Sequence, residues 1–513
     1  MKKRIFALVL SSLLIFTAAG CGGWEDDLDP LGELSAYYKE ESDEPSLTAV
    51  TTFTLPYYAE KTLDPITCDD GIQHTVSTLL YEGLYRLDHA FAPQPVLASS
   101  CQYDVETYTY TIRLRSDAVF SDGSPVTAED AAATLERARL SPRYLGRFRA
   151  VDKITAEENS VVIQLQEDNR LFLSRLDVPI VKAGTENNMV PTGSGPYVWV
   201  VGEEGPYLTA SPLWWKSETA PLMQIDLQAY KSTAAAVYAF TAREVQLLFC
   251  DLIGDRDMPS TVVGDYADTD TTVLEYLNYN VNTGVFADRS LRAAVNAAIN
   301  REELISAYLM GHGCAAQFPI HPHSGLYPAE LEEPYQSDSF YQALSDLDMV
   351  SDKGWLSANF LVNEENSFKV SLANKIAEIL DTGDLHVTVV TLPWEQYVEA
   401  IYNQEYDLFL GEVKMTADWD ATTLFGGVGT MNFAYYYNPD MDDLLAEYLS
   451  AEEESRPLAA EKLCRFMQSE APITPLFFKE NTVLTTSDLV TGLHPTETNP
   501  FYDISTWKIE LTK

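Results

Sequence analysis

Two hydrophobic periods are mixed along this chain from residue 47 onward, and they restrict it to folds that contain both helices and strands. In segment 108–115, Tyr, Ile and Leu alternate with Thr and Arg, which is the period of a strand with one buried face. The β-branched runs at 161–165 and 387–392 also predict strands. Together with the helices described next, these strands predict an α/β or α+β protein.

Three helices are predicted from the residues that begin them. Thr127 and Asp130 have the spacing of a capping box, and an alanine-rich stretch follows them to Arg139. Asp288 is expected to cap a second helix that has one apolar face, and Asn300 to cap a third. Because Arg289, Arg292 and Arg301 recur at helical spacing in these last two segments, we expect them to lie on a solvated or salt-bridged face.

The length and charge of the chain limit its architecture and its partners. With 513 residues it is too long for one ordinary hydrophobic core, so two lobes or more are expected. Apolar residues make up 46% of the chain and charged residues 22%, which is typical of globular proteins. The formal net charge of −43 repels phosphate backbones and excludes nucleic acid as a partner. We interpret this charge as a source of solubility, and the alternative is adaptation to a cationic ligand or an acidic cell envelope.

The six cysteines give no sign of a zinc or redox motif, because no two have C-x-x-C spacing. Cys21 belongs to the N-terminal signal described next. The other five are an odd number, so they cannot all pair with one another. Packed thiols are the expectation, since cysteine has a strong tendency to be buried.

A secretion signal is predicted in residues 1–21. Positive charges at residues 2–4 precede an apolar run at 5–16 that is too short for a good membrane span. The segment Ala18-Ala19-Gly20-Cys21 resembles a bacterial lipobox, which implies that the Cys21 thiol receives a diacylglycerol and becomes the new N-terminus. The alternative is an ordinary cleaved signal in which the cysteine is a coincidence.

Segment 22–46 is expected to be a solvated tether. It holds nine acidic residues and one lysine, so it cannot bury enough apolar surface to fold alone. No later apolar run reaches about 18 residues. We therefore expect a protein that is anchored by lipid at Cys21 to the extracytoplasmic face of the cell membrane.

Six short blocks of sequence carry a resemblance to a known family. They read LDP at 63–65, LYEGL at 80–84, PVLA at 95–98, YTIRLR to FSDGSPVTAED at 110–130, PTGSGPY at 191–197 and DRSLRAAVNAAINR at 288–301. In this order they are similar to blocks of the bacterial extracellular solute-binding proteins of family 5, the peptide and nickel group. The resemblance runs from about residue 47 to residue 507.

The resemblance implies an α/β fold of the two-lobed, periplasmic-binding-protein-like type II, with a ligand cleft between the lobes. The first lobe would be discontinuous and comprise residues 47–63, 190–272 and 471–513. An extra subdomain of this lobe would span residues 64–189. The second lobe would span residues 273–470.

The resemblance also implies a function. The protein would capture oligopeptides by closing its lobes, deliver them to an ABC permease in the membrane and act as a monomer without a cofactor. The same fold could instead bind a nickel chelate, a glycan or another solute. An envelope hydrolase or a structural protein is the alternative from a different class.

Sequence motifs of catalysis and metal binding give no support to an enzyme. The patterns H-E-x-x-H, G-x-S-x-G and the P-loop do not occur. The segment 311–316 fits G-x-G-x-x-A, but it follows a predicted helix where a dinucleotide site needs a strand. His321 and His323 form a two-histidine loop that could bind a metal, but because the chain has only seven histidines we interpret it as an ordinary loop. We therefore expect no catalytic residues and no metal site.

Asp418 is the candidate anchor for a ligand. In peptide-binding members of the family, an aspartate of the second lobe pairs with the α-ammonium group of the peptide. It lies in a W-x-x-D-like segment that follows a Tyr-Asp strand, and the family's segment at this place reads A-D-[YW]. Ala417-Asp418-Trp419, downstream of Tyr406-Asp407, is similar to that arrangement and implies the same role for Asp418. The alternative is that Asp418 is a solvated turn residue.

Four further residues are candidates for the ligand site. The stretch before Asp418 is about two residues longer than in the family, and Lys414-Met415 stands where a tryptophan is common. For that reason Glu412 or Asp420 could serve as the anchor instead. Trp394 and Trp419 are the expected apolar walls.

Overall fold

The computed structural model describes residues 50–216, 218–252, 263–347 and 355–512. The predicted signal, the lipidation site Cys21 and the tether 22–46 lie outside these residues. No helix within the described ranges is both long and apolar enough to cross a membrane.

The first four-stranded sheet gathers strands from two distant parts of the chain. Its order is β1 (Thr54–Tyr57), β10 (Gln224–Ala229), β9 (Pro206–Ala210) and β8 (Tyr197–Val201). β1 runs parallel to β10, and the other neighbours are antiparallel. The helices nearby are α3 (Gly71–Ser77) and α5 (Thr233–Thr241).

A second, antiparallel sheet forms a separate layer with its own core. Its order is β4 (Ala98–Asp104), β5 (Thr109–Leu114), β7 (Ser160–Leu165) and β6 (Val151–Glu157), and α4 (Ala128–Leu140) packs on it. The alternating residues of β5 bury Tyr110, Ile112 and Leu114 in this core. A short hairpin, β2 (Tyr85–Leu87) and β3 (Pro93–Pro95), and the 3₁₀ turn η1 (Phe172–Arg175) complete this part.

The third sheet has seven strands. Its order is β11 (Leu247–Cys250), β17 (Ile473–Thr485), β12 (Asp265–Tyr279), β16 (Leu408–Lys414), β14 (Leu356–Asn363) and β15 (Leu385–Leu392), and β13 (Gly313–Ala315) also pairs with β17. The α-helices that surround it are α6 (Arg289–Ala298), α7 (Arg301–Tyr308), α8 (Ser339–Asp346), α9 (Ser367–Leu380), α10 (Trp394–Tyr402), α11 (Thr422–Phe425), α12 (Pro439–Ser450) and α13 (Arg456–Glu470). The remaining elements are η2 (Val285–Ala287), η3 (Ala329–Leu331), η4 (Ile504–Thr506), β18 (Val490–Thr491) and β19 (Lys508–Ile509).

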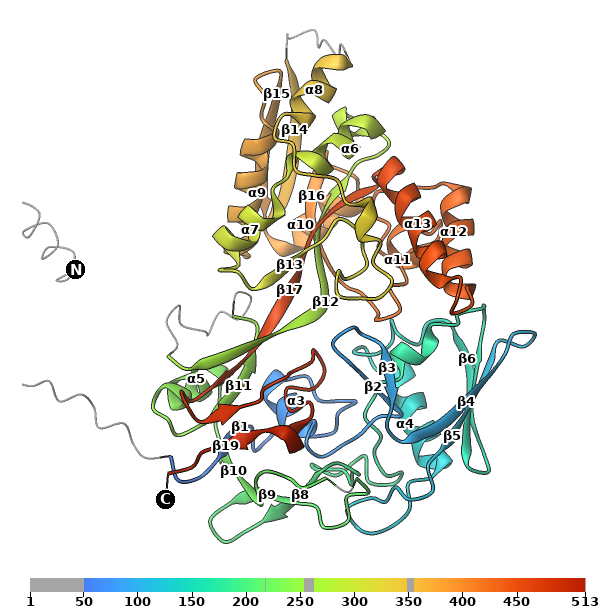
Figure 1. The fold of residues 1–513 in the computed structure, drawn as a ribbon. Coiled ribbons are helices and arrows are strands. Elements are labelled where there is room, and N and C mark those ends of the chain that lie inside the picture. Colours follow the sequence, from blue (N-terminus) through green and yellow to red (C-terminus); the bar gives the residue numbers. More distant parts are fainter. Residues whose placement is uncertain (1–49, 217, 253–262, 348–354, 513) are drawn as a thin grey trace, which may run out of the picture. The chain divides into compact units, whose positions relative to one another are not determined.

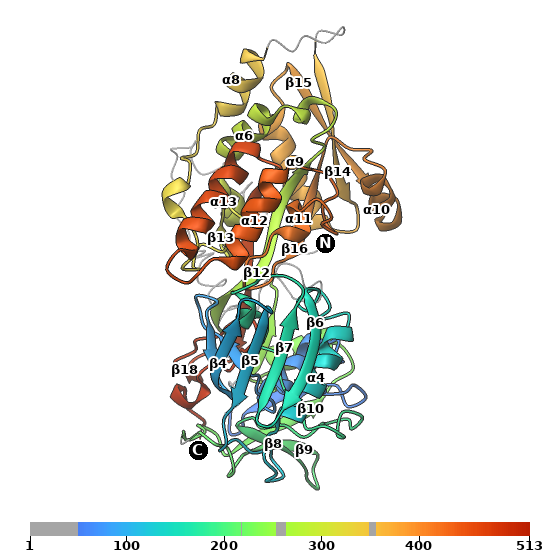
Figure 2. The ribbon, with the colours of Figure 1, turned by 90° about the vertical axis from the view of Figure 1, so that its right-hand side faces the viewer.

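Two long strands, β12 and β17, connect the two lobes of the fold. In Figure 1 they run as an antiparallel pair from the part that holds β11 and α5 to the part that holds β14 and β16. We call the part built on the two four-stranded sheets and β11 the first lobe. The part built on β13 to β16 is the second lobe, and Figure 2 shows the two lobes from the side. The pairing of β12 with β17 shifts register between Asp270 and Leu274, where the pair passes from one lobe to the other.

The predicted α/β class with two lobes is confirmed, and so are the six predicted elements. The strands appear as β5, β7 and β15, and the helices as α4, α6 and α7. Thr127 and Asp130 form the predicted capping box of α4. Asp288 and Asn300 accept hydrogen bonds from backbone N–H groups in the first turns of α6 and α7. The predicted boundaries between lobes and subdomain remain predictions.

The prediction that the arginines of α6 and α7 lie on a solvated or salt-bridged face is wrong for two of the three. Arg289 is exposed and pairs with Glu470. Arg292 and Arg301 are buried, with 4% and 7% of their surface exposed. Each donates hydrogen bonds to several backbone carbonyls, which explains how a charged group is tolerated in the core.

Candidate functional site: a cavity between the lobes

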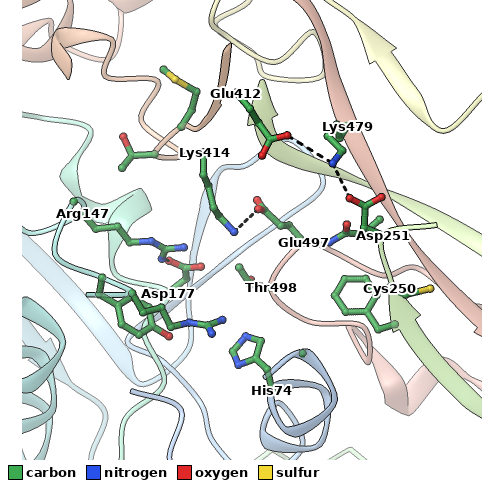
Figure 3. A pocket seen from close by; sticks show the side chains of 18 of the residues that line it. His74, Arg147, Asp177, Cys250, Asp251, Glu412, Lys414, Lys479, Glu497 and Thr498 are labelled. Atoms are coloured by element: carbon green, nitrogen blue, oxygen red, sulfur yellow. Dashed lines mark hydrogen bonds and ion pairs between the residues drawn. The ribbon is translucent and has the colours of Figure 1, made fainter. Parts of the chain in front are cut away.

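A cavity of about 1120 Å³ lies between the two lobes. The first lobe contributes α3, the turn after α4 and the end of β11 to its walls, and the second lobe contributes β16 and the start of α9. The connecting strand β17 and the loop at 497–498 complete it. Figure 3 shows that side chains from these different segments point into one space.

The charges on the walls of the cavity balance, although the chain as a whole is strongly acidic. Four basic and four acidic side chains line it: Arg143, Arg147, Lys414, Lys479, Asp177, Asp251, Glu412 and Glu497. Their formal charges, +4 and −4, sum to zero, whereas the whole chain carries −43. Because cations are scarce elsewhere, their concentration here makes the cavity suitable for a ligand that carries an anionic group.

One wall of the cavity centres on Lys479 of β17. Its ammonium group lies 2.7 Å from Asp251 Oδ2 and 3.8 Å from Glu412 Oε2 (Figure 3). Burial lowers the pKa of Lys479, but Asp251, Glu412 and Glu275 together raise it more, so the net shift is upward and the group stays charged. Burial raises the pKa of Glu412, while Lys369 and Lys479 lower it, and the net shift is downward, so this carboxylate stays ionised.

A second ion pair crosses the cavity at Lys414. Its Nζ lies 2.7 Å from Glu497 Oε1. Glu497 is itself held in place, because its Oε2 accepts a hydrogen bond of 3.1 Å from the backbone N–H of Thr272. The pair thus links the end of β16 to the loop that precedes η4.

The opposite wall is cationic and includes a neutral histidine. Arg147 pairs with Asp177, whereas Arg143 has no carboxylate within ion-pair distance among the described residues and donates to the Cys68 carbonyl at 3.3 Å. Burial, together with the charges of Arg143, Lys414 and Arg147, lowers the pKa of His74 to about 3. His74 is therefore neutral at physiological pH. The positive charge on this wall comes from the arginines, and Arg143 has no carboxylate partner among the described residues.

A second cavity, of about 480 Å³, adjoins the first inside the second lobe. It shares Asn366 and Glu412 with the main cavity. Its walls are mainly apolar and aromatic: Tyr276, Trp394, Tyr397, Val398, Ile401, Tyr402, Phe409, Leu410, Met431 and Phe433. We call it the aromatic side cavity. Its shape and lining suit an apolar side chain whose polar parent chain occupies the main cavity.

Asp418, the candidate anchor, does not line either cavity. It is fully buried at the junction of the lobes, where its Oδ2 accepts hydrogen bonds from Arg175 Nε at 2.5 Å and Asn169 Nδ2 at 2.9 Å. Its Oδ1 has no hydrogen-bond partner within the described part of the chain. In this structure a side chain of the first lobe is thus the cationic partner of Asp418.

The other four candidates fall into two groups. Glu412 lines both cavities and Trp394 lines the aromatic side cavity. Trp419 is 1% exposed and donates from Nε1 to Ser324 Oγ at 3.0 Å, and Asp420 pairs with Arg175 at 2.8 Å. Trp419 and Asp420 therefore belong with Asp418 to the lobe junction.

The cavity residues of the first lobe are absent from the sequence candidates. Arg143, Arg147 and His74 lie in segments that the resemblance treats as part of an extra subdomain. A sequence signal exists, since the chain has only 34 basic residues against 77 acidic ones and several arginines follow α4 closely. Their convergence with Glu412 and Lys479 depends on the packing of the lobes.

The loop that the sequence predicts to be ordinary brings possible metal ligands together. Asp270, Cys314, His321 and His323 each offer an atom within 4.8 Å of the others. None of the four lines the main cavity. The prediction of no metal site remains untested, and these residues are considered separately below.

Comparison with known sequences identifies one family. The profile of the bacterial extracellular solute-binding proteins, family 5 Middle, matches residues 92–431. The glutathione-binding protein GsiB of Escherichia coli is 23% identical over 460 residues, which cover 81% of this chain and 86% of GsiB.

Solved structures share the fold over nearly their whole length. A nickel ABC transporter protein of Bacillus halodurans superposes with a TM-score of 0.73 at 19% identity, covering 87% of this chain and 98% of that protein. The oligopeptide-binding protein AppA of Bacillus subtilis, in complex with a nonapeptide, superposes with a TM-score of 0.61 at 18% identity, covering 90% of this chain and all of that one. The predicted type II periplasmic-binding-protein fold is confirmed by these similarities.

Proposed function

Because the chain belongs to the bacterial extracellular solute-binding proteins of family 5, the substrate-capturing components of ABC importers, we propose that its own substrate is a short peptide. Delivery of the captured solute to a membrane permease follows from the family. The choice of a peptide rests on the cavity between the lobes, whose charges balance and whose side cavity is aromatic.

The two walls of the main cavity suit the two ends of a peptide. Arg143 lacks a carboxylate partner among the described residues, so a ligand carboxylate would complete its interactions. Glu412 is an ionised carboxylate on the opposite side and is the proposed partner of the ligand ammonium. The sequence analysis names it as an alternative to Asp418, and Asp418 already has Arg175 as its counter-ion.

The aromatic side cavity supports a peptide that carries a bulky apolar side chain. Trp394 is 56% exposed, so its ring has surface left to cover. A single aromatic or aliphatic side chain that fills this space would exclude water from Trp394 and its neighbours. The side cavity opens beside Glu412, so we place the apolar side chain near the amino end of the peptide.

The names of relatives are consistent with a peptide and keep one alternative open. GsiB is named for glutathione, AppA is complexed with a nonapeptide, and the Bacillus halodurans protein is a nickel transporter component. The peptide proposed for this chain agrees with the first two names, glutathione and a nonapeptide. A nickel chelate, a glycan or another solute would be revealed by the experiments below.

Anchoring by lipid at Cys21 is part of the proposal, together with action as a monomer on the extracytoplasmic face of the membrane. It is supported by the small residues before Cys21 and the acidic segment after it. Metabolic labelling with a fatty-acid analogue should mark the wild-type protein, and Cys21→Ala should remove the label and release the protein. A wild-type protein that takes up no label would contradict this part.

Calorimetric titration with a panel of peptides tests the proposed substrate. Free tripeptides with an aromatic first residue should bind, whereas N-acetylated and C-amidated forms of the same peptides should each bind more weakly. Arg143→Gln should lose the preference for a free carboxylate and keep the preference for a free ammonium. A panel in which no peptide binds, while nickel–histidine or an oligosaccharide does, would overturn the peptide assignment and leave the family membership intact.

Closure of the lobes is testable with the same ligand. A peptide that touches both walls favours the closed state, so saturating ligand should reduce the radius of gyration measured by small-angle X-ray scattering. No change with a ligand that calorimetry has verified would contradict closure.

A further inference from the structure

Four side chains with metal-binding chemistry meet where β12 bends between the lobes. Asp270 belongs to β12, Cys314 to β13, and His321 and His323 to the loop that follows β13. One ligand atom of each lies within 4.8 Å of the others. A small cavity of about 200 Å³, lined in part by Asp270 and His323, gives access to this group.

Asp270 is the centre of the group. Its Oδ2 lies 2.5 Å from His323 Nδ1 and its Oδ1 lies 3.4 Å from His321 Nε2. Cys314 is a free thiol, and its strand is hydrogen-bonded to β17. Two segments more than 40 residues apart, β12 and β13 with its following loop, therefore present oxygen, sulfur and nitrogen donors to one point.

His321 has a different role from His323. Its side chain is fully buried, and its Nδ1 accepts the backbone N–H of His323 at 3.1 Å. Because Nδ1 accepts this bond, a ring proton sits on Nε2, the nitrogen that faces Asp270 and has no hydrogen-bond partner within the described residues. A proton on Nε2 prevents that nitrogen from binding a metal. It allows His321 to donate a hydrogen bond to Asp270 and orient it, as residues that contact metal ligands commonly do.

We propose that Asp270, Cys314 and His323 bind one transition-metal ion of the zinc type, with His321 holding Asp270 and a fourth position open to the small cavity. The donor set favours this class, because thiolate and imidazole suit zinc, cobalt and nickel, whereas magnesium and calcium need oxygen ligands. Binding through His323 Nδ1 moves the ring proton to the exposed Nε2. The Cys314 thiol becomes a thiolate, so one proton is released for each ion bound.

The geometry needs only a small adjustment to accept an ion. Bonds of about 2.0 to 2.3 Å from zinc to each donor hold neighbouring donors more than about 3 Å apart. The side chains of Asp270 and His323, 2.5 Å apart, must separate slightly. His323 is 59% exposed in its side chain and can move outward.

The position of the group suggests what the ion would do. Asp270 marks the register shift of β12, and β13 and its loop belong to the second lobe. An ion held by Asp270, Cys314 and His323 would tie the bend of β12 to that lobe. This inference is independent of the peptide proposal, because the main cavity is lined by other residues.

Titration of the chelator-treated protein with cobalt chloride and with zinc chloride tests the site. We expect one ion per chain, release of about one proton, and a thiolate-to-cobalt charge-transfer absorption in the near ultraviolet. Cys314→Ser should abolish the absorption, and His323→Ala should weaken zinc binding by at least about tenfold. Cys101→Ser removes a free thiol outside the group and should change neither result.

Three results would overturn the site. They are no stoichiometric binding of either metal, cobalt binding without the thiolate band, and a band that survives in Cys314→Ser. Circular dichroism of each variant without metal separates loss of the site from loss of the fold. If Cys314→Ser fails to fold, Asp270→Asn tests the same claim through cobalt stoichiometry, which should then fall below one.

Discussion

Arg175 of η1 and Asp418, which follows β16, form an ion pair that joins the two lobes away from β12 and β17. The distance from Arg175 Nε to Asp418 Oδ2 is 2.5 Å, and the side chains are 3% and 0% exposed. Arg175 also binds Asp420 at 2.8 Å, so one guanidinium serves two carboxylates. Burial lowers the pKa of Arg175, but Asp418 and Asp420 raise it more, and the net shift is upward.

Removing Arg175 should destabilise the protein strongly. Arg175→Ala leaves Asp418 buried without its cation, and breaking a buried pair in this way costs about 3–5 kcal/mol. Urea unfolding, followed by tryptophan fluorescence, measures the loss. Arg289→Ala is the matched control, because the Arg289 side chain is 67% exposed and its pair with Glu470 should contribute less than about 1 kcal/mol. Equal losses for the two variants would contradict the importance of the junction.

Glu412 and Asp418 should differ in their effect on ligand binding. Glu412→Gln should weaken the binding of a free peptide by about 1.5–3 kcal/mol, the scale of a hydrogen bond to a charged group. N-acetylation of the peptide should cause a similar loss, and the two losses should not add, because they remove the same interaction. Asp418→Asn should mainly reduce stability, since its partner is Arg175. If calorimetry shows that Asp418→Asn removes the ammonium preference and Glu412→Gln does not, Asp418 is the anchor that the family resemblance implies.

Trp394 should determine the preference for apolar side chains. Trp394→Ala should weaken the binding of peptides with an aromatic first residue by about 1–3 kcal/mol, because a buried aromatic contact is lost. Peptides with alanine at that position should be affected much less. Tyr238→Ala, a change of an exposed aromatic residue on α5, should leave both affinities unchanged. A uniform loss across all peptides would show that Trp394 acts on the fold instead of the ligand.

Glu275 should make stability depend on pH. It is fully buried in β12, its carboxylate oxygens have no hydrogen-bond partner within the described residues, and Lys369 lies 3.2 Å away. Burial raises its pKa to about 7, Lys369 opposes the shift and Glu412 adds to it. A carboxyl group with a raised folded-state pKa favours folding below its unfolded pKa of about 4.5 and loses that effect as the pH rises through 7.

Glu275→Gln should therefore gain stability relative to the wild type as the pH increases from about 4.5 to 8. The difference should approach about 3 kcal/mol and level off above pH 8, since 2.5 pKa units correspond to that size. Urea unfolding at a series of pH values provides the measurement. A difference that stays constant with pH would show that Glu275 does not titrate in this range.

Local signals allowed the elements to be predicted, because they act between residues that are close in the sequence. The side chains of Thr127, Asp288 and Asn300 each bond to a backbone N–H within three residues, and the alternation in β5 needs only one buried face. The burial of Arg292 and Arg301 could not be predicted in this way. Their hydrogen bonds go in part to carbonyls more than 170 residues away.

The site was predicted only in part for the same reason. Glu412, near the end of β16, and Trp394, at the start of α10, both line cavities. The partner of Asp418 is Arg175, which is 243 residues away in the sequence, so no local sequence pattern predicts this pair. Arg143 and His74 acquire their role only when the first lobe faces β16 and β17.

The identity of the molecule that occupies the main cavity is the most direct test of the account. Native mass spectrometry of the purified protein, followed by fragmentation of whatever is released, identifies a ligand that the protein retains. We predict a bound peptide that disappears in the Arg143→Gln/Glu412→Gln variant. A retained ligand that contains no peptide bond, or a peptide that binds equally well to the double variant, would contradict it.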